Sequence, residues 1–170
     1  LVITNKDGKK YNSDASKAEN YYAFGQDVLA PADGKVIKVQ NYLRDYAYAG
    51  TGSISLGTRD MRGNYLIIHH ANHLYSSIAH LKQNSCKVKP GDLVKQGQVI
   101  AKCGNSGHST EPHIHFQVQD HPNFYLAVGL PILFKNMEIE PKSNRLFCKN
   151  SMVRLCSEDL LSEVRSTLKK

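Results

Sequence analysis

In Val28-Leu-Ala-Pro-Ala-Asp-Gly-Lys-Val-Ile-Lys-Val-Gln40, a short strand leads into a turn at Gly34 and a second strand follows. From Lys35 onward polar and apolar residues alternate, which is typical of a strand with one buried face. Short runs of this kind, separated by glycine turns, recur at 64–70, 74–81 and 86–101. The chain to about residue 120 is therefore predicted to be all-β.

The composition of the 170 residues, 41% hydrophobic and 22% charged, indicates one globular domain. No apolar run reaches the length of a membrane span, and the first residues lack the pattern of a signal peptide. The net charge of +7 favours an anionic partner, such as a cell-envelope polymer or a membrane surface. The basic residues are scattered without a nucleic-acid-binding signature, so no nucleic acid is expected as a partner.

The one predicted helix lies near the C-terminus. Ser157 is a suitable N-cap, and the charges at the two ends of the segment suit the helix dipole. An apolar stripe follows at helical spacing: Leu160, Leu161, Val164 and Leu168. We expect this short helix to dock on the sheet.

Two histidines stand two residues apart in Gly107-His-Ser-Thr-Glu-Pro-His-Ile-His-Phe-Gln-Val118. On a strand, side chains at i and i+2 point to the same face, so His113 and His115 can converge on one point. Imidazole is well suited to binding zinc and to moving protons near neutral pH. The alternative is an ordinary half-exposed strand, because spacing alone is a weak signal.

A tyrosine-rich loop occupies residues 41–63, where the strand rhythm stops. Loops of this length are often functional. Tyr42, Tyr46 and Tyr48 either line a binding groove or pack the loop against the domain.

The four cysteines include no Cys-x-x-Cys pair, which argues against a structural zinc knuckle. A disulfide between Cys148 and Cys156 would close a short loop. Four buried free thiols, including Cys86 and Cys103, fit the sequence equally well.

Taken in order, five motifs resemble the lysostaphin-like (LytM-type) zinc metallopeptidases, a family that cleaves peptides of bacterial peptidoglycan. They are Val28–Gly34, Gly63-Asn64, Ala79-His80-Leu81, Val88–Gly97 and Gly104–His115. The resemblance implies a mainly antiparallel folded sheet of barrel-sandwich type with an open groove. It implies a metallopeptidase domain at 1–136 with its core at 22–120, followed by a C-terminal extension at 137–170 that carries the helix. Biotinyl and lipoyl carrier domains share two of these motifs, but they carry a modified lysine in a context that this chain lacks.

The resemblance also implies roles for the histidines. His115, the second of the pair, would be a ligand of a single zinc ion, while His113 and His80 would flank the water that attacks the peptide. Zinc lowers the pKa of a bound water toward ~7, and a neighbouring imidazole can then take the proton. His108, in the loop before the pair, would contact substrate together with the three tyrosines.

The family's early zinc motif, a His three residues before an Asp, is missing, because no His precedes His69. In some relatives a Gln-x-x-Ala-x-Asp variant replaces it, and an apolar strand follows that Asp directly. Leu1-Val-Ile-Thr resembles such a strand, so the remaining zinc ligands are expected upstream of Leu1. The alternatives are a degenerate site, or replacement of the missing ligands by Asp7 or Asp14.

The function implied is a zinc-dependent endopeptidase that hydrolyses peptide cross-links of peptidoglycan. The alternative is a catalytically degenerate domain that binds the cell envelope or activates a separate cell-wall amidase. By the same resemblance, the partner is peptidoglycan or another anionic envelope polymer, and the location is the periplasm or the outside of the cell.

Overall fold

The computed structural model describes residues 1–50, 60–71, 73–134, 137–139, 146–148 and 153–154. One short 3₁₀ helix, η1 (Ala18–Asn20), precedes the strands. The strands in chain order are β1 (Asp27–Leu29), β2 (Gly34–Gln40), β3 (Asn64–His69), β4 (Tyr75–Leu81), β5 (Leu93–Val94), β6 (Val99–Lys102), β7 (His115–Gln119), β8 (Gly129–Leu130), β9 (Leu133–Phe134), β10 (Met137–Ile139), β11 (Leu146–Cys148) and β12 (Val153–Arg154).

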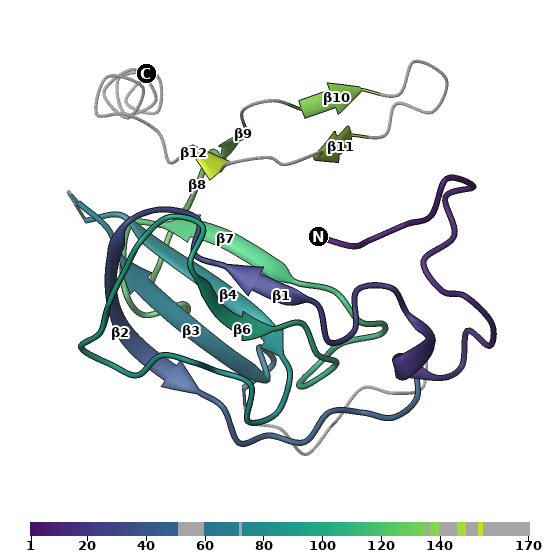
Figure 1. Cartoon of the computed structure of the whole chain (residues 1–170). Helices are drawn as coiled ribbons and strands as arrows, with labels where there is room; N and C mark the ends of the chain where they lie inside the picture. The colour runs from purple at the N-terminus through teal and green to yellow at the C-terminus, as the bar shows by residue number, and fades with distance from the viewer. Residues whose placement is uncertain (51–59, 72, 135–136, 140–145, 149–152, 155–170) are drawn as a thin grey trace.

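The main sheet has the strand order β5-β2-β3-β4-β7-β8, and every pairing in it is antiparallel. The pair β1–β6 lies across one face of this sheet (Figure 1). The largest apolar core fills the space between the two layers, with Val36, Leu66 and Ile78 from the sheet and Val28 and Ile100 from the pair. Two-stranded pairs β9–β12 and β10–β11 follow.

The prediction of an all-β, mainly antiparallel fold is confirmed, and β1 to β4 lie in the segments where the sequence predicted strands. The segment 86–101 differs, because its first half is not a strand and β5 begins only after the Gly91 turn. Pro90 has no N–H to donate to a ladder, and Lys87 pairs with Ile100 through a single 2.8 Å backbone bond. The predicted C-terminal helix lies outside the described residues. No helix among the described ranges has the length and apolarity needed to cross a bilayer.

A β-bulge at His80 interrupts the pairing of β3 with β4. Tyr65 pairs with Ala79 and Asn64 with Leu81, so His80 is an extra residue with φ of 63°. Strict alternation would send His80 into the core that holds Ile78. The bulge returns Leu81 to that core and turns His80 away from it. A left-handed conformation is uncommon for a residue other than glycine, and such strain concentrates at functional sites.

Residues 1–26, which we term the N-terminal arm, lie against the edge of the domain. Leu1 and Ile114 exchange two backbone bonds, with Leu1 N donating to Ile114 O at 2.6 Å and Ile114 N donating to Leu1 O at 2.9 Å. Further along, Ala18 N donates to Ala47 O and Ala49 N to Ser16 O, at 2.9 and 2.7 Å. The arm therefore contacts both the segment before β7 and the tyrosine-rich loop.

Two glycines bring the start of β3 against the loop before β7. Gly63 has φ of 65° and Gly107 has φ of 75°. A Cβ on Gly63 would stand 2.4 Å from the carbonyl carbon of Ser106, and one on Gly107 would stand 2.3 Å from Gly63 N. This contact allows Ser106 Oγ to accept from Asn64 N at 2.9 Å and to donate to Leu81 O at 2.7 Å.

Gly63→Ala is expected to destabilise the domain more than Gly97→Ala. Both positions have positive φ, so each alanine loses about 1–2 kcal/mol to backbone strain. Only Gly63 also meets backbone atoms, which adds about 1–3 kcal/mol of overpacking, whereas a Cβ at Gly97 has open space. Urea unfolding of the two variants measures the difference. Equal losses in the free energy of unfolding would show that the backbone around Gly63 can shift to accommodate the Cβ without an energetic penalty.

Candidate functional site

Three histidines from two segments of the chain meet beside the main sheet. The ring centroids of His80 and His113 are 4.7 Å apart, with the planes tilted by 47°. The rings of His80 and His115 are 6.2 Å apart and nearly perpendicular. The structure thus brings together the three residues that the motifs singled out as ligand and catalytic groups.

His80 is buried, with only 6% of its surface exposed. Its Nδ1 lies 2.8 Å from Ser106 O, and since a carbonyl oxygen only accepts, Nδ1 carries the hydrogen. The lone pair of the ring is therefore on Nε2. The pKa of His80 is lowered to about 4, mainly by burial and also by the neighbouring His113, His115 and His108, while the bond to Ser106 O acts in the opposite direction. This imidazole is neutral at pH 7.

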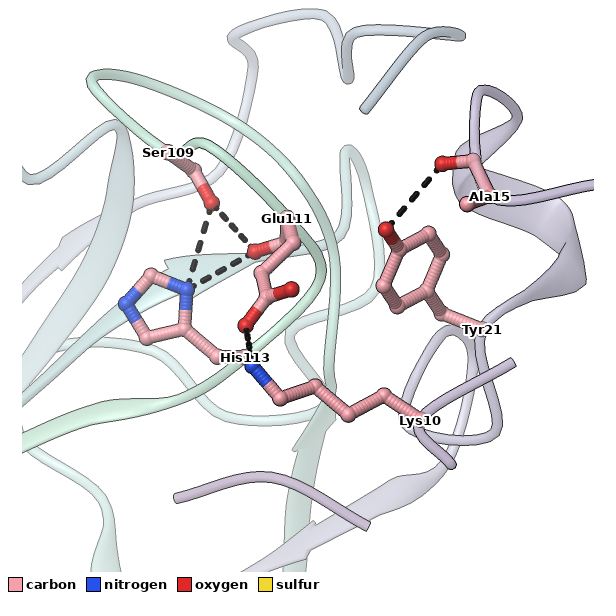
Figure 2. Close-up of polar contacts among 6 residues, drawn as sticks. All are labelled: Lys10, Ala15, Tyr21, Ser109, Glu111 and His113. Atoms are coloured by element: carbon pink, nitrogen blue, oxygen red, sulfur yellow. Dashed lines mark hydrogen bonds and ion pairs between the residues drawn. The ribbon is translucent and has the colours of Figure 1, made fainter. Parts of the chain in front are cut away.

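His113 has the same tautomer through a different carbonyl. Its Nδ1 lies 2.8 Å from Glu111 O and 3.3 Å from Ser109 Oγ, as Figure 2 shows. Ser109 Oγ itself donates to Glu111 O at 2.7 Å, so the three residues form a closed network. Burial is the main cause that lowers the pKa of His113. Its Nε2 is left as the acceptor.

The prediction that His113 and His115 share one strand is wrong in detail, because β7 begins at His115. The last pair between β4 and β7 is Ala79 with His115, and the bulge at His80 ends the regular ladder there. Pro112 and the ring bond from His113 to Glu111 O set the preceding turn. The two imidazoles still face the same site, because the rings of His113 and His115 both pack beside the ring of His80.

His115 is the exposed member of the three. Among the described residues its ring nitrogens have no hydrogen-bond partner, and its ring packs edge-on toward Phe124 at 6.5 Å. An imidazole with a free ring nitrogen is a suitable zinc donor. The donor chemistry of His115 therefore fits the predicted metal role.

Within the part of the chain that the structure describes, no three His, Cys, Asp or Glu side chains are grouped so as to hold a metal ion. Asp7 and Asp14, the alternative ligands, are exposed on the N-terminal arm, and the Asp14 carboxylate accepts from Ser16 N and Oγ. Cys86 and Cys103 are free thiols whose pKa values burial raises to about 11 and 12. The described residues thus supply His115 as a donor but not a full zinc site.

The tyrosine-rich loop runs beside the segment that leads to the histidines. Asn105 Nδ2 donates to Tyr46 O and Tyr48 O at 3.1 and 3.2 Å, and Gly50 N donates to Thr110 O at 2.7 Å. Tyr42 and Tyr48 are largely exposed, at 68% and 65%, so they do not pack the loop down. Tyr46 is half-buried. These contacts leave the predicted substrate role of the three tyrosines open to test.

His108 lies close enough to His80 to influence its pKa. Its backbone N–H donates to Met61 O at 2.9 Å. Its Nε2 is buried, and no hydrogen-bond partner for it exists among the described residues. An unpaired polar atom at this place is a suitable contact for a substrate group.

Arg62 and Phe124 border the site, and no sequence pattern singled out either residue. Arg62 is buried, pairs with Asp60 at 2.6 Å, and stacks its guanidinium 3.7 Å from the Tyr65 ring centroid. The same guanidinium lies 5.0 Å from Phe124, which is the aromatic neighbour of His115. Arg62 therefore braces the ring that borders the site.

Comparison with known protein families matches residues 17–125 to "Peptidase family M23". The chain is similar to the peptidoglycan DD-endopeptidase ShyB of Vibrio cholerae, with 38% identity over 110 residues, which is 64% of this chain and 21% of ShyB. It is also similar to the murein hydrolase activator NlpD of Escherichia coli, with 33% identity over 95 residues, which is 56% of this chain and 20% of NlpD. The match spans about a fifth of the length of these curated relatives.

Two solved structures resemble the fold. A zinc-containing peptidase from Vibrio cholerae has 32% identity and a TM-score of 0.44, and the match covers 62% of this chain and 26% of that one. Lysostaphin from Staphylococcus simulans has 27% identity and a TM-score of 0.46, with 62% and 38% covered.

Proposed function

The chain belongs to peptidase family M23, as its ordered motifs predicted, and we propose that it is the peptidase domain of a zinc-dependent endopeptidase that cleaves peptide cross-links of bacterial peptidoglycan. The observation that carries this proposal is the convergence of His80, His113 and His115. A binding module has no need for two neutral imidazoles with free Nε2 atoms beside a third, exposed one.

Zinc would be held by His115 and by ligands upstream of Leu1. Because Leu1 and Ile114 exchange both bonds, they form an antiparallel hydrogen-bonded pair. In a longer chain that continued this pairing, the residue before Leu1 would stand opposite His115. Directly opposite residues point their side chains to the same face, with Cβ atoms about 5 Å apart. A carboxylate at that position would therefore share a metal with His115.

Bound zinc would supply a Lewis acid that makes water a nucleophile at neutral pH. His113 Nε2 is the proton acceptor, because Glu111 O keeps the hydrogen on Nδ1. After it has taken the proton, the His113 ring can deliver it to the departing amine. The ring centroid of His80 lies 4.7 Å from that of His113, and its Nε2 lone pair can accept a hydrogen bond from the attacking water and so help to orient it.

Hydrolysis of purified peptidoglycan by a chain extended upstream of Leu1 tests this function. We expect cross-linked muropeptides to decrease and new free amino groups to appear, as mass spectrometry of the digest would measure. Chelation of divalent metal should stop the reaction, and zinc should restore it. Intact cross-links with zinc present would contradict the endopeptidase proposal.

The second candidate is an activator of a separate cell-wall amidase. It is favoured by the similarity to the activator NlpD and by the incomplete metal group in the described residues. Adding a purified amidase to the same assay separates the candidates. If the chain is an activator, stem peptides should be released only when the amidase is present. The His113→Ala variant should then still stimulate the amidase.

We propose that binding to peptidoglycan combines long-range attraction by the net charge of +7 with short-range contacts from Tyr42, Tyr46, Tyr48 and His108. Binding to peptidoglycan should weaken as salt shortens the Debye length from about 8 Å to ~3 Å, whereas tyrosine contacts survive screening. A sedimentation assay over a salt series, with wild type and a triple Tyr→Ala variant, measures both parts. Retention that ignores salt would remove the electrostatic part, and a variant that binds like wild type at 1 M salt would remove the tyrosines.

With peptidoglycan as the proposed substrate, we expect the protein in the cell envelope or outside the cell. Fractionation of the producing cells checks this, and recovery only from the cytoplasm would contradict it.

A further inference from the structure

Lys10 of the N-terminal arm forms an ion pair with Glu111 (Figure 2). The two residues are 101 positions apart in the chain, and Glu111 stands in the loop that carries His113. Both the carboxylate and the backbone carbonyl of Glu111 form polar contacts. Its carboxylate binds Lys10, while its backbone carbonyl accepts from Ser109 Oγ and faces His113 Nδ1.

The backbone around Lys10 is itself held in place. Lys10 O accepts from Tyr22 N at 2.9 Å, and Tyr11 forms a β-bridge with Tyr21. The Tyr21 hydroxyl then donates to Ala15 O at 3.0 Å, which closes the loop of the arm (Figure 2). The Lys10 ammonium group is carried by this fixed backbone, so it can restrain the loop that contains Glu111.

We propose that Lys10, acting through Glu111, is a positioning residue that holds the His113 ring in its Nδ1–H form and orientation. This rests on the proposed role of His113. The ion pair is partly exposed, with 42% of the Lys10 side chain and 26% of the Glu111 side chain accessible, so its effect on global stability is small. Its effect on catalysis is larger, because small displacements of a catalytic group slow a reaction steeply.

The first test follows the ring without any activity assay. Long-range proton–nitrogen correlation spectra of the chain report which nitrogen of His113 carries hydrogen. In wild type the signals should be those of the Nδ1–H form. In Lys10→Met and in Glu111→Gln, which keeps the backbone carbonyl, they should move toward a mixture of both forms. Lys10→Arg keeps the charge and should restore the wild-type spectrum.

Lys9→Met is the matched control, because Lys9 is exposed and forms no ion pair within the described residues. Its spectrum should equal that of wild type. A His113 spectrum in Lys10→Met that is indistinguishable from wild type would overturn the proposal. Loss of the folded spectrum as a whole would show instead that Lys10 acts only on folding.

The second test measures hydrolysis by the extended protein. Lys10→Met should lower kcat about 10-fold while KM stays within about 2-fold, since the ion pair orients a catalytic group and contacts no substrate. Lys10→Arg should recover most of the rate. An inactive wild type would count against the proposed function alone, because the spectra still decide the role of Lys10.

Discussion

Replacing His113 by alanine, or His80 by alanine or asparagine, is expected to slow peptidoglycan hydrolysis by about 10²-fold or more, while zinc content stays close to wild type. Both rings have Nδ1 bound to a backbone carbonyl, so Nε2 is the working atom of each. Removing either ring removes a proton acceptor or a hydrogen-bond acceptor that orients the water, but it removes no expected zinc ligand. Hydrolysis rates and elemental analysis of the extended protein measure the two quantities.

The asparagine variant at His80 separates chemistry from backbone strain. His80 has φ of 63°, a conformation that asparagine tolerates better than alanine does. His80→Asn should therefore fold like wild type and still lack activity. The exposed His121 serves as a control, and His121→Ala should retain full activity. Loss of zinc from the His80 or His113 variants would show that the residue is a ligand and that the proposed roles are wrong.

His115→Ala is expected to remove zinc from the protein extended upstream of Leu1. The extended wild type should hold about one zinc ion. A zinc site needs three or four protein ligands, so removal of the His115 ligand should release the ion. The chain that starts at Leu1 should bind zinc weakly, since one histidine with solvent cannot replace a full site. Elemental analysis after dialysis measures all three proteins.

A matched variant guards against misfolding. His113→Ala alters the neighbouring imidazole and should keep its zinc, so the pair of variants distinguishes a lost ligand from a damaged loop. Tight, stoichiometric zinc in His115→Ala would overturn the ligand assignment. Equal zinc in the short and extended chains would instead place the remaining ligands within residues 1–170.

Much of the site was predictable from the chain because its parts are local. The alternating residues of β2 specify a strand through the two faces of a sheet, and the short apolar runs of β3 and β4 specify buried strands. The glycines at 63 and 107 mark backbone that must approach backbone closely. The histidine pair near the start of β7 and the motif around His80 predicted the three residues of the site. The ring of His80 now stands 4.7 Å from that of His113 and 6.2 Å from that of His115, centroid to centroid.

Only the tertiary structure decided how those residues are presented. The bulge that releases His80 exists because Ile78 and Leu81 both pack in the larger core, and this competition between faces is absent from any local pattern. The free Nε2 of each ring depends on carbonyls supplied by Ser106 and Glu111. Lys10 reaches Glu111 across a hundred residues. A sequence specifies which side chains are available, but long-range pairing sets their tautomers and orientation, because these depend on which buried groups must find partners.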